Sequence, residues 1–384
     1  EANSSLDAFD IQTQVRLVFG QGAVESVGKH AARLGGRRVL LVTDEGIVRA
    51  GHAAKAIEHL QSAGLEVATF ASVRENPTAA DIDLCVEAAR DHKTDFLAGL
   101  GGGSSMDTAK GCNFIFTNGG KMQDYWGIGK APHPMLPLIA KPTTAGTGSD
   151  CQSFALIADA KTHQKMACGD SKAAAAVAIL DPELTLSQPR KVSACTGIDA
   201  LSHAIESGVS LKRNAFSWMH SQEATKCIFT GLERVLTHPD DLEARGQLLL
   251  GAALAGTAIE NSMLGAAHAT ANPLTARFGV IHGMAVGVML PHVMRLNAAD
   301  PSVQACYAQL ARFSFVSEEK RDDMASQDLI QAVEKALEIA EIPGSLEQHG
   351  VTSEDLDVLA EMATEQWTKD QWNSDGLSPQ MEKR

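Results

Sequence analysis

Short apolar runs alternate with amphipathic helical stretches throughout the first half of this chain. The helical stretches show apolar residues spaced three and four apart, as over 79–92. Continuous apolar strands separated by amphipathic helices are typical of a parallel sheet that is covered on both faces. The strands predicted in this way are 38–43, 65–70, 96–100, 136–140 and 175–180.

The pattern changes after Asp181-Pro182. From about residue 192 the chain consists of successive Ala- and Leu-rich helical patterns with few strand signals, and the boundary falls near Pro189. The sequence therefore predicts an α/β domain over residues 1–190 and an all-helical domain over residues 191–384. We expect the active site in the cleft between the two domains.

Composition excludes several classes of partner. The chain has 384 residues, of which 44% are hydrophobic, so a large core is expected. Its formal net charge of -14 repels nucleic acid and anionic membrane surfaces. No apolar run reaches the roughly 20 residues that span a bilayer. The sequence predicts neither a nucleic-acid nor a membrane partner.

The number and spacing of the cysteines indicate whether the protein resides in a reducing or an oxidising compartment. The seven cysteines are scattered, odd in number and form no Cys-x-x-Cys pair. This pattern argues against a disulfide framework or a thiolate zinc site and favours a reducing cytoplasm. The N-terminal residues show no basic segment followed by an apolar one, so the sequence predicts no export signal.

A glycine-rich turn connects the strand at 96–100 to the next helix. Gly101-Gly102-Gly103-Ser104-Ser105 allows close backbone approach, and a following helix offers free N–H groups to a phosphate. The turn lacks the Gly-x-Gly-x-x-Gly and Walker patterns, so a tight connection without a ligand is the alternative.

A second polar turn covers residues 142–149 and contains four hydroxyl side chains and two glycines. It can donate to ribose and phosphate oxygens, or it can satisfy its own backbone. Asp44 ends the first strand, where a carboxylate can bind the adenosine ribose and favours NAD over NADP. Asp44 can equally be a helix N-cap. Two such turns in one domain favour a dinucleotide.

Four residues of the second half suggest a metal site. Asp199 and His203 are one helical turn apart, so both project from one face, and His268 and His282 lie in a second apolar segment. One carboxylate and three imidazoles suit a divalent first-row metal, with Fe²⁺ and Zn²⁺ as the leading candidates. As alternatives, Asp199 can cap a helix that starts near Thr196, and each histidine can be a hydrogen-bonded core residue.

These segments together resemble the iron-containing (group III) alcohol dehydrogenase family over nearly the whole chain. The motifs that carry the resemblance are 17–23, 76–78, 101–110, 142–149, 179–185, 197–206, 282–284 and 290–292. The resemblance implies a dehydroquinate-synthase-like fold, with a nucleotide-binding α/β domain followed by an all-helical metal-binding and substrate domain. It also implies a homodimer or a higher homo-oligomer.

The resemblance also assigns residues. Asp199, His203, His268 and His282 match the family's metal ligands. The positions that match the family's NAD site are Asp44, Asn76, Gly102, Gly103, Ser104, Thr143, Thr144, Thr147, Lys165 and Leu184. The implied activity is hydride transfer between nicotinamide and a small alcohol or aldehyde held at the metal, which acts as a Lewis acid.

The chain departs from the family at Asn272, where a histidine is usual four residues after His268. The position is a candidate for substrate contact or proton relay, but Asn cannot titrate near neutral pH. Two other classes share the fold: a sugar-phosphate cyclase-type lyase that uses NAD transiently, and a non-catalytic NAD-sensing protein. Few Lys and Arg residues surround the ligand segments, which counts against the lyase, and a complete ligand set counts against the sensor.

Overall fold

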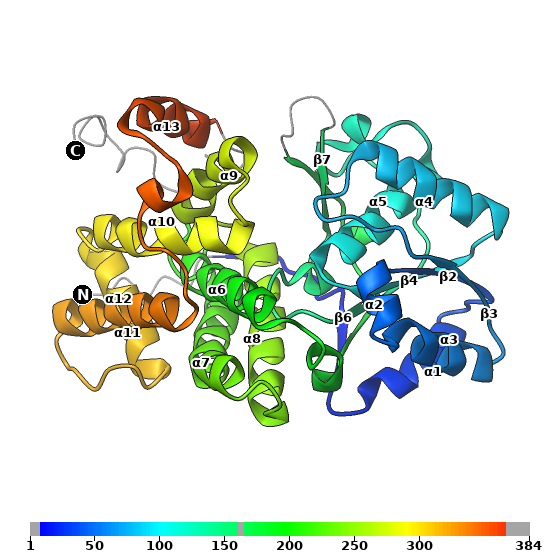
Figure 1. Ribbon diagram of the computed structural model, residues 1–384, viewed down its shortest axis with the longest axis horizontal. Helices are drawn as coiled ribbons and strands as arrows, with labels where there is room; N and C mark the ends of the chain where they lie inside the picture. Colours follow the sequence, from blue (N-terminus) through cyan, green and yellow to red (C-terminus); the bar gives the residue numbers. More distant parts are fainter. Residues whose placement is uncertain (1–7, 160–164, 366–384) are drawn as a thin grey trace. The chain divides into compact units, whose positions relative to one another are not determined.

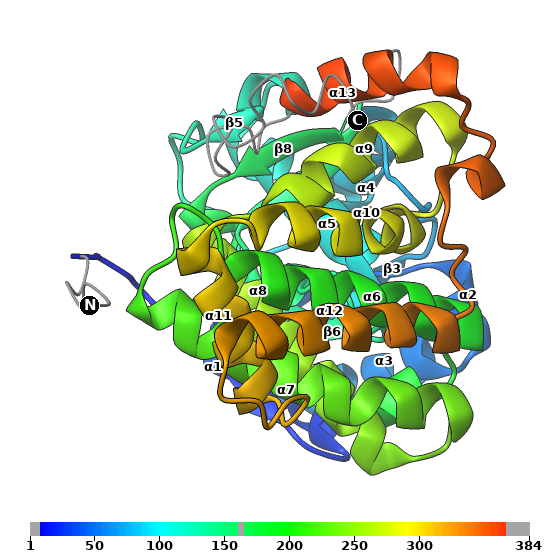
Figure 2. The same ribbon diagram turned by 90° about the vertical axis from the view of Figure 1, so that its left-hand side faces the viewer.

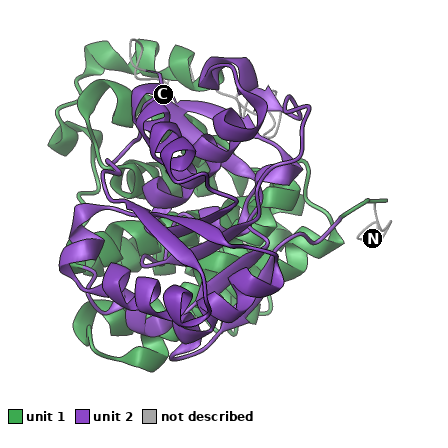
Figure 3. Cartoon of the chain, turned by 90° about the vertical axis from the view of Figure 1, so that its right-hand side faces the viewer, with its two compact units in different colours: residues 1–11, 189–384 green, residues 12–188 purple. Residues whose placement is uncertain are grey.

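The computed structural model describes residues 8–159 and 165–365. The chain divides into two compact units, which Figure 3 colours separately. The α/β unit comprises Gln12–Gln188, and the helical unit comprises Pro189–Arg384 together with Glu1–Ile11. The predicted functional division, with dinucleotide binding in residues 1–190 and metal and substrate binding in 191–384, stays a prediction.

A six-stranded parallel sheet forms the centre of the α/β unit (Figure 1). Its strands, in spatial order, are β1 (Arg16–Phe19), β9 (Val177–Leu180), β6 (Leu138–Pro142), β4 (Phe96–Gly101), β2 (Arg38–Val42) and β3 (Glu66–Phe70). A small second sheet contains β5 (Gly127–Ile128), β8 (Lys165–Gly169) and β7 (Phe154–Ala158). All five predicted strands are confirmed within two residues at each end. Strand β1 and the small sheet were not predicted.

Helices cover both faces of the large sheet. The helices of this unit are α1 (Val27–Arg33), α2 (Glu45–Arg49), α3 (His52–Ser62), α4 (Ala79–Asp91) and α5 (Gly103–Asn118). On one face, Ala98 and Leu100 of β4 share a buried apolar cluster with residues of α1 and α3. On the other face, Gly99 lies against Met106 and Ala109 of α5. The continuous burial of β4 follows from this double cover.

The helical unit contains no strand among its described residues, and α6, α7 and α8 pack against one another. Helix α10 packs against α6, α9 and α12 (Figure 2). The helices of this unit are α6 (Arg190–Ser207), α7 (Ala215–Thr237), α8 (Leu242–Ser262), α9 (Ala266–Phe278), α10 (His282–Asn297), α11 (Pro301–Phe313), α12 (Asp322–Ile339) and α13 (Leu356–Thr364). The predicted fold class, an α/β domain followed by an all-helical one, is confirmed.

Within residues 8–159 and 165–365, no single helix is long and apolar enough to cross a bilayer. Helices α8 and α9 together pass that test of length and composition across a bend of 104°.

Candidate metal centre

Helix α6 places Asp199 and His203 in its buried interior. The helix begins at Arg190, directly after Pro189, and continues to Ser207. Asp199 is therefore in the third turn, and the alternative in which it caps a helix near Thr196 is wrong. Both side chains are buried, and they project from the same face because they are four residues apart.

Helices α9 and α10 supply the two other histidines. His268 lies in the first turn of α9 and is buried. Gly279 ends α9 in the left-handed region, with φ of 64°, which lets the chain turn back into α10 within a few residues. His282 is the first residue of α10, and its side chain is 28% exposed. The tight connection brings His282 back beside His268.

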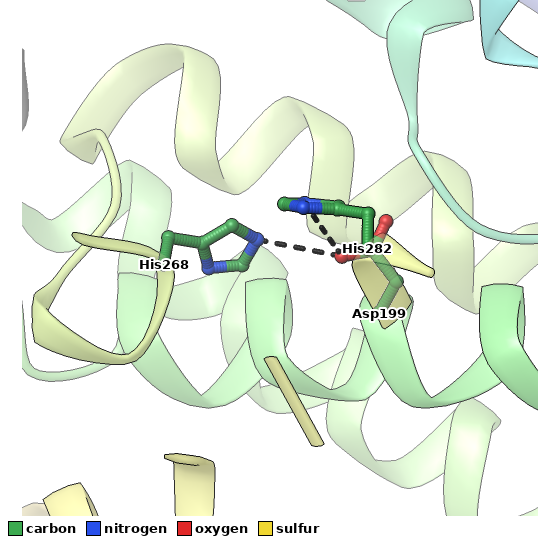
Figure 4. Close-up of side chains that lie close together, drawn as sticks. All are labelled: Asp199, His268 and His282. Carbon is green, nitrogen blue, oxygen red and sulfur yellow. Dashed lines mark ion pairs between the residues drawn. The ribbon is translucent and has the colours of Figure 1, made fainter. Parts of the chain in front are cut away.

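All three imidazoles converge on one carboxylate oxygen. The Nε2 atoms of His268, His203 and His282 lie 3.4, 3.5 and 3.6 Å from Oδ1 of Asp199. Figure 4 shows the side chains of Asp199, His268 and His282, whose ligand atoms lie within 4.8 Å of one another. A tetrahedral zinc site with bonds of about 2.1 Å places ligand atoms about 3.4 Å apart. The three oxygen-to-nitrogen distances therefore fit a single bound cation. The group whose ligand atoms all lie within 4.8 Å of one another contains Asp199, His268 and His282 and leaves out His203.

The buried polar atoms of this cluster are better satisfied by a cation than by hydrogen bonds to one another. Oδ1 of Asp199 and Nε2 of His268 are buried, and neither has a hydrogen-bond partner among the described residues. Their 3.4 Å separation is not aligned as a hydrogen bond. Buried polar groups without partners are costly, and a divalent ion would satisfy both atoms. The chemistry of this donor set, one oxygen and three nitrogens, fits Fe²⁺ or Zn²⁺.

The charges of the four groups are coupled. Burial raises the pKa of Asp199, but His203, His282 and His268 outweigh it, so the pKa lies well below its ordinary value. Burial lowers the pKa of His268, whereas the carboxylates of Glu206 and Asp199 raise it, to about 9 overall. The centre therefore favours positive charge beside Asp199. A metal ion held there would take the place of a proton at Nε2 of His268, the nitrogen that faces Asp199.

Asn272 lies one turn beyond His268 in α9 and is partly exposed. The spacing of four residues puts it on the same face of the helix as His268. Its amide can hydrogen-bond a hydroxyl but cannot exchange a proton near neutral pH. A role in substrate contact stays a prediction.

In the α/β unit, the glycine-rich turn and the second polar turn lie against each other. Gly102 precedes α5 and Gly103 is its first residue. A Cβ at Gly103 would lie 2.7 Å from Cγ2 of Thr147, and one at Gly102 would lie 3.4 Å from Cγ2 of Thr144. The two turns therefore form one cradle at the N-terminus of a 16-residue helix, where N–H groups point outward.

Asp44 caps helix α2 and also lies beside the glycine-rich turn. Its Oδ1 accepts a hydrogen bond of 3.0 Å from the backbone N–H of Ile47, so it is an N-cap of α2. Its Oδ2 would lie 3.3 Å from a Cβ at Gly101 and so is beside the glycine-rich turn. A ribose contact through this second oxygen stays a prediction.

The other predicted cofactor residues have different surroundings. Ser104 is in the first turn of α5, and the N–H of Thr143 donates to the carbonyl of Gly101 over 2.9 Å. Leu184 is buried in the apolar cluster of the sheet. Asn76 has a positive φ of 52°, and Lys165 begins β8. Their roles toward NAD stay predictions.

Sequence reasoning missed a buried polar network between the two turns. The Ser149 hydroxyl donates to Asp107 of α5 over 2.8 Å, and Lys110 of the same helix donates to that hydroxyl over 2.9 Å. Lys110 also donates to the carbonyl of Phe154 over 3.0 Å. Asp107 and Lys110 are in the same helical segment as the glycines, so the motif contained the signal. Sequence reasoning also missed Glu206, which contacts His268.

Comparisons with known proteins agree with these features. Residues 14–182 match the family model described as iron-containing alcohol dehydrogenase, and residues 193–374 match the C-terminal model of the Fe-containing alcohol dehydrogenase family. The chain is 32% identical over 355 residues to NAD-dependent methanol dehydrogenase of Bacillus methanolicus, and the match covers 91% of each protein.

Solved structures extend the similarity to the whole fold. A 1,3-propanediol oxidoreductase superposes with a TM-score of 0.91 at 31% identity, over 95% of each chain. Sulfoacetaldehyde reductase from Bifidobacterium kashiwanohense, in complex with NAD⁺, superposes with a TM-score of 0.83 at 28% identity, over 93% of this chain and 92% of that one. The fold is thus the dehydroquinate-synthase-like fold that the resemblance implied. The chain belongs to the iron-containing alcohol dehydrogenase family.

Proposed function

We propose that this protein is an NAD(H)-dependent alcohol dehydrogenase and aldehyde reductase that requires one divalent metal ion. The observation that carries the proposal is the convergence of three imidazole nitrogens on Oδ1 of Asp199. A second unit of the same chain offers a glycine-rich cradle at the N-terminus of α5. A metal centre and a nucleotide cradle are the two parts that hydride transfer to or from an alcohol needs.

Separate residues bind the metal ion and orient the substrate. Asp199, His203, His268 and His282 hold the ion, which when bound supplies Lewis acidity toward a hydroxyl or carbonyl oxygen. His282 is the most exposed of the four, so we place substrate access on its side of the centre. Asn272 orients the substrate hydroxyl by hydrogen bonding and does not relay its proton.

The cofactor is NAD rather than NADP. The Asp44 carboxylate beside the glycine-rich turn would accept hydrogen bonds from ribose hydroxyls and would repel a 2′-phosphate. Gly102, Gly103 and Ser104 bind the pyrophosphate through backbone N–H groups. The similarity to a reductase solved with NAD⁺ supports this choice.

The remaining residues with predicted cofactor contacts line the rest of the nucleotide. They are Asn76, Thr143, Thr144, Thr147, Lys165 and Leu184.

The metal is Fe²⁺ or Zn²⁺, since the donor set suits both and cellular supply decides occupancy. The substrates are small alcohols and the corresponding aldehydes, in keeping with the methanol and propanediol activities named for the relatives.

The buried free cysteines fit a cytoplasmic enzyme. We further propose a homodimer or higher homo-oligomer, which light scattering of the purified protein would test.

The decisive experiment removes the metal and restores it. Protein stripped with a chelator should lose activity, and anaerobic Fe²⁺ or Zn²⁺ should restore NADH production from a panel that includes methanol, ethanol and 1,3-propanediol. NADP⁺ tested in parallel should react far more slowly. If neither metal restores oxidation of any alcohol or reduction of any aldehyde, the proposal is wrong. A cyclase-type lyase would consume its substrate without net accumulation of NADH. Against a lyase, the similar proteins are named as a dehydrogenase, an oxidoreductase and a reductase.

A further inference from the structure

Glu206 lies on the face of α6 that carries Asp199 and His203. The three positions follow a spacing of four and then three residues, which lines up side chains along one helical face. Glu206 is only 3% exposed. A buried carboxylate is costly unless both of its oxygens have partners, so its partners indicate what it does.

Each carboxylate oxygen of Glu206 has its own donor. Oε1 accepts a hydrogen bond of 2.6 Å from the backbone N–H of Ala267, and Oε2 lies 2.5 Å from Nδ1 of His268. An ionised carboxylate only accepts hydrogen bonds, so the proton in the second contact belongs to Nδ1 of His268. In a neutral imidazole this leaves the Nε2 lone pair free. That nitrogen is the one that faces Asp199 at 3.4 Å.

We propose that Glu206 is a positioning residue for the metal centre: it fixes the tautomer and orientation of His268 and raises the basicity of its ligating nitrogen. A carboxylate behind a metal-bound histidine has this effect in general, and its loss costs about 10- to 100-fold in metal affinity. The inference rests on the proposed function, because it assumes that His268 binds the ion.

The start of α9 is shaped around this carboxylate. A Cβ at Gly265 would lie 3.0 Å from Oε1 of Glu206 and 3.4 Å from its Cδ. The backbone of Gly265, with φ of −124° and ψ of −156°, is extended and accessible to any residue. Gly265→Ala therefore displaces Glu206 by contact without backbone strain and without removing its charge.

Glu206 also lies at the positive end of the α9 dipole, so a purely structural role as a helix cap is the competing explanation. The two explanations differ in what they predict for the metal. A cap supports folding stability alone. A positioning residue also changes the affinity of the folded protein for metal.

The test compares wild type, Glu206→Gln and Gly265→Ala, with Glu223→Gln as the control. Glu223 pairs with Lys226 on α7 and is partly exposed. In Glu206→Gln the single amide oxygen can accept a hydrogen bond from only one of the two donors, the N–H of Ala267 and Nδ1 of His268. The other donor then faces an NH₂ group. The dissociation constant for Zn²⁺, measured by chelator competition, should rise about 10- to 100-fold in Glu206→Gln and less in Gly265→Ala. The control should match wild type, and NADH binding should be unchanged in every variant.

The outcomes separate the two proposals. If wild type binds neither Zn²⁺ nor, in a parallel anaerobic titration, Fe²⁺, the proposed function fails. If wild type binds zinc and folded Glu206→Gln and Gly265→Ala bind it equally well, Glu206 is a cap and the inference fails. Nitrogen-15 histidine spectra of zinc-loaded wild type supply a readout that needs no variant: a downfield Nδ1–H signal should report the Glu206 contact. Its absence would also overturn the inference.

Discussion

Gly103, the first residue of α5, lies so close to Thr147 that a Cβ at position 103 would come within 2.7 Å of Cγ2 and 2.8 Å of Oγ1 of the threonine. This contact joins two turns that are more than forty residues apart in the chain. Thr147 in turn accepts a hydrogen bond of 3.3 Å from the N–H of Ser149. The shape of the proposed pyrophosphate cradle therefore depends on the missing side chain at Gly103.

Gly103→Ala should weaken NADH binding about tenfold or more, because the added methyl must push Thr147 and the second turn away from α5. Overpacking of this kind costs about 1–3 kcal/mol of stability. Fluorescence titration with NADH measures the first effect and thermal unfolding the second. Gly344→Ala is the matched control, since a Cβ there meets nothing within 4 Å. Unchanged NADH affinity in Gly103→Ala would contradict a nucleotide role for the turn.

His268→Ala should abolish stoichiometric metal binding and metal-dependent turnover while NADH binding survives. The substitution removes one of three nitrogens around Asp199 and leaves the α/β unit untouched. Metal content by mass spectrometry and NADH titration provide the two readouts. His292→Ala on α10 is the control because that side chain is exposed and outside the proposed site. Full metal content in His268→Ala would count against the ligand set.

Lys141→Met should stabilise the protein at neutral pH. Lys141 is fully buried in β6, and its amine has no hydrogen-bond partner among the described residues. Burial lowers the pKa of Lys141 to about 7 from 10.5. At pH 7 the unfolded chain is protonated at this lysine and the folded chain only in part, so the native amine is destabilising. Methionine has a similar shape without this cost.

The pH dependence follows from the same shift. Between about pH 7 and pH 10.5 the unfolded state binds more protons at Lys141 than the folded state does. The free energy of unfolding therefore rises with pH over this range because of Lys141. The gain from pH 7 to pH 9 is roughly 2 kcal/mol. The difference in melting temperature between Lys141→Met and wild type should therefore be larger at pH 7 than at pH 9. An equal difference at both values would show that Lys141 is not buried as a neutral amine.

Asn272→His should add an ionisation to the pH profile of turnover. An imidazole one turn from His268 can exchange protons near its ordinary pKa of about 6.5, which an amide cannot do. The kcat of the variant should vary across pH 5–8, whereas wild type should show no such step from this position. Metal content should be equal in both. Identical profiles would indicate that position 272 does not touch the proton path.

Local sequence predicted five strands of the large sheet and the helical character of the second unit. The continuous apolar runs at 38–43 and 96–100 became β2 and β4, because a strand that is covered on both faces is apolar along its length. The helical patterns after about residue 192 became the helical unit, because a spacing of three and four residues lines up the buried face of a helix. The pair Asp199 and His203 was also readable, since one helix fixes their spacing. His268 and His282 were proposed from their place in a second apolar segment, and the family resemblance then matched all four residues to metal ligands.

Tertiary packing decided which side chains of these elements come into contact. Only the crossing of α6, α9 and α10 brings three Nε2 atoms to one oxygen of Asp199. Only the packing of the start of α9 against α6 places the Glu206 carboxylate behind His268. Lys141 was expected just beyond a strand, but β6 continues through it and buries its amine. Periodicity reports the burial of a face within one element, whereas contacts between elements depend on how side chains from distant segments pack.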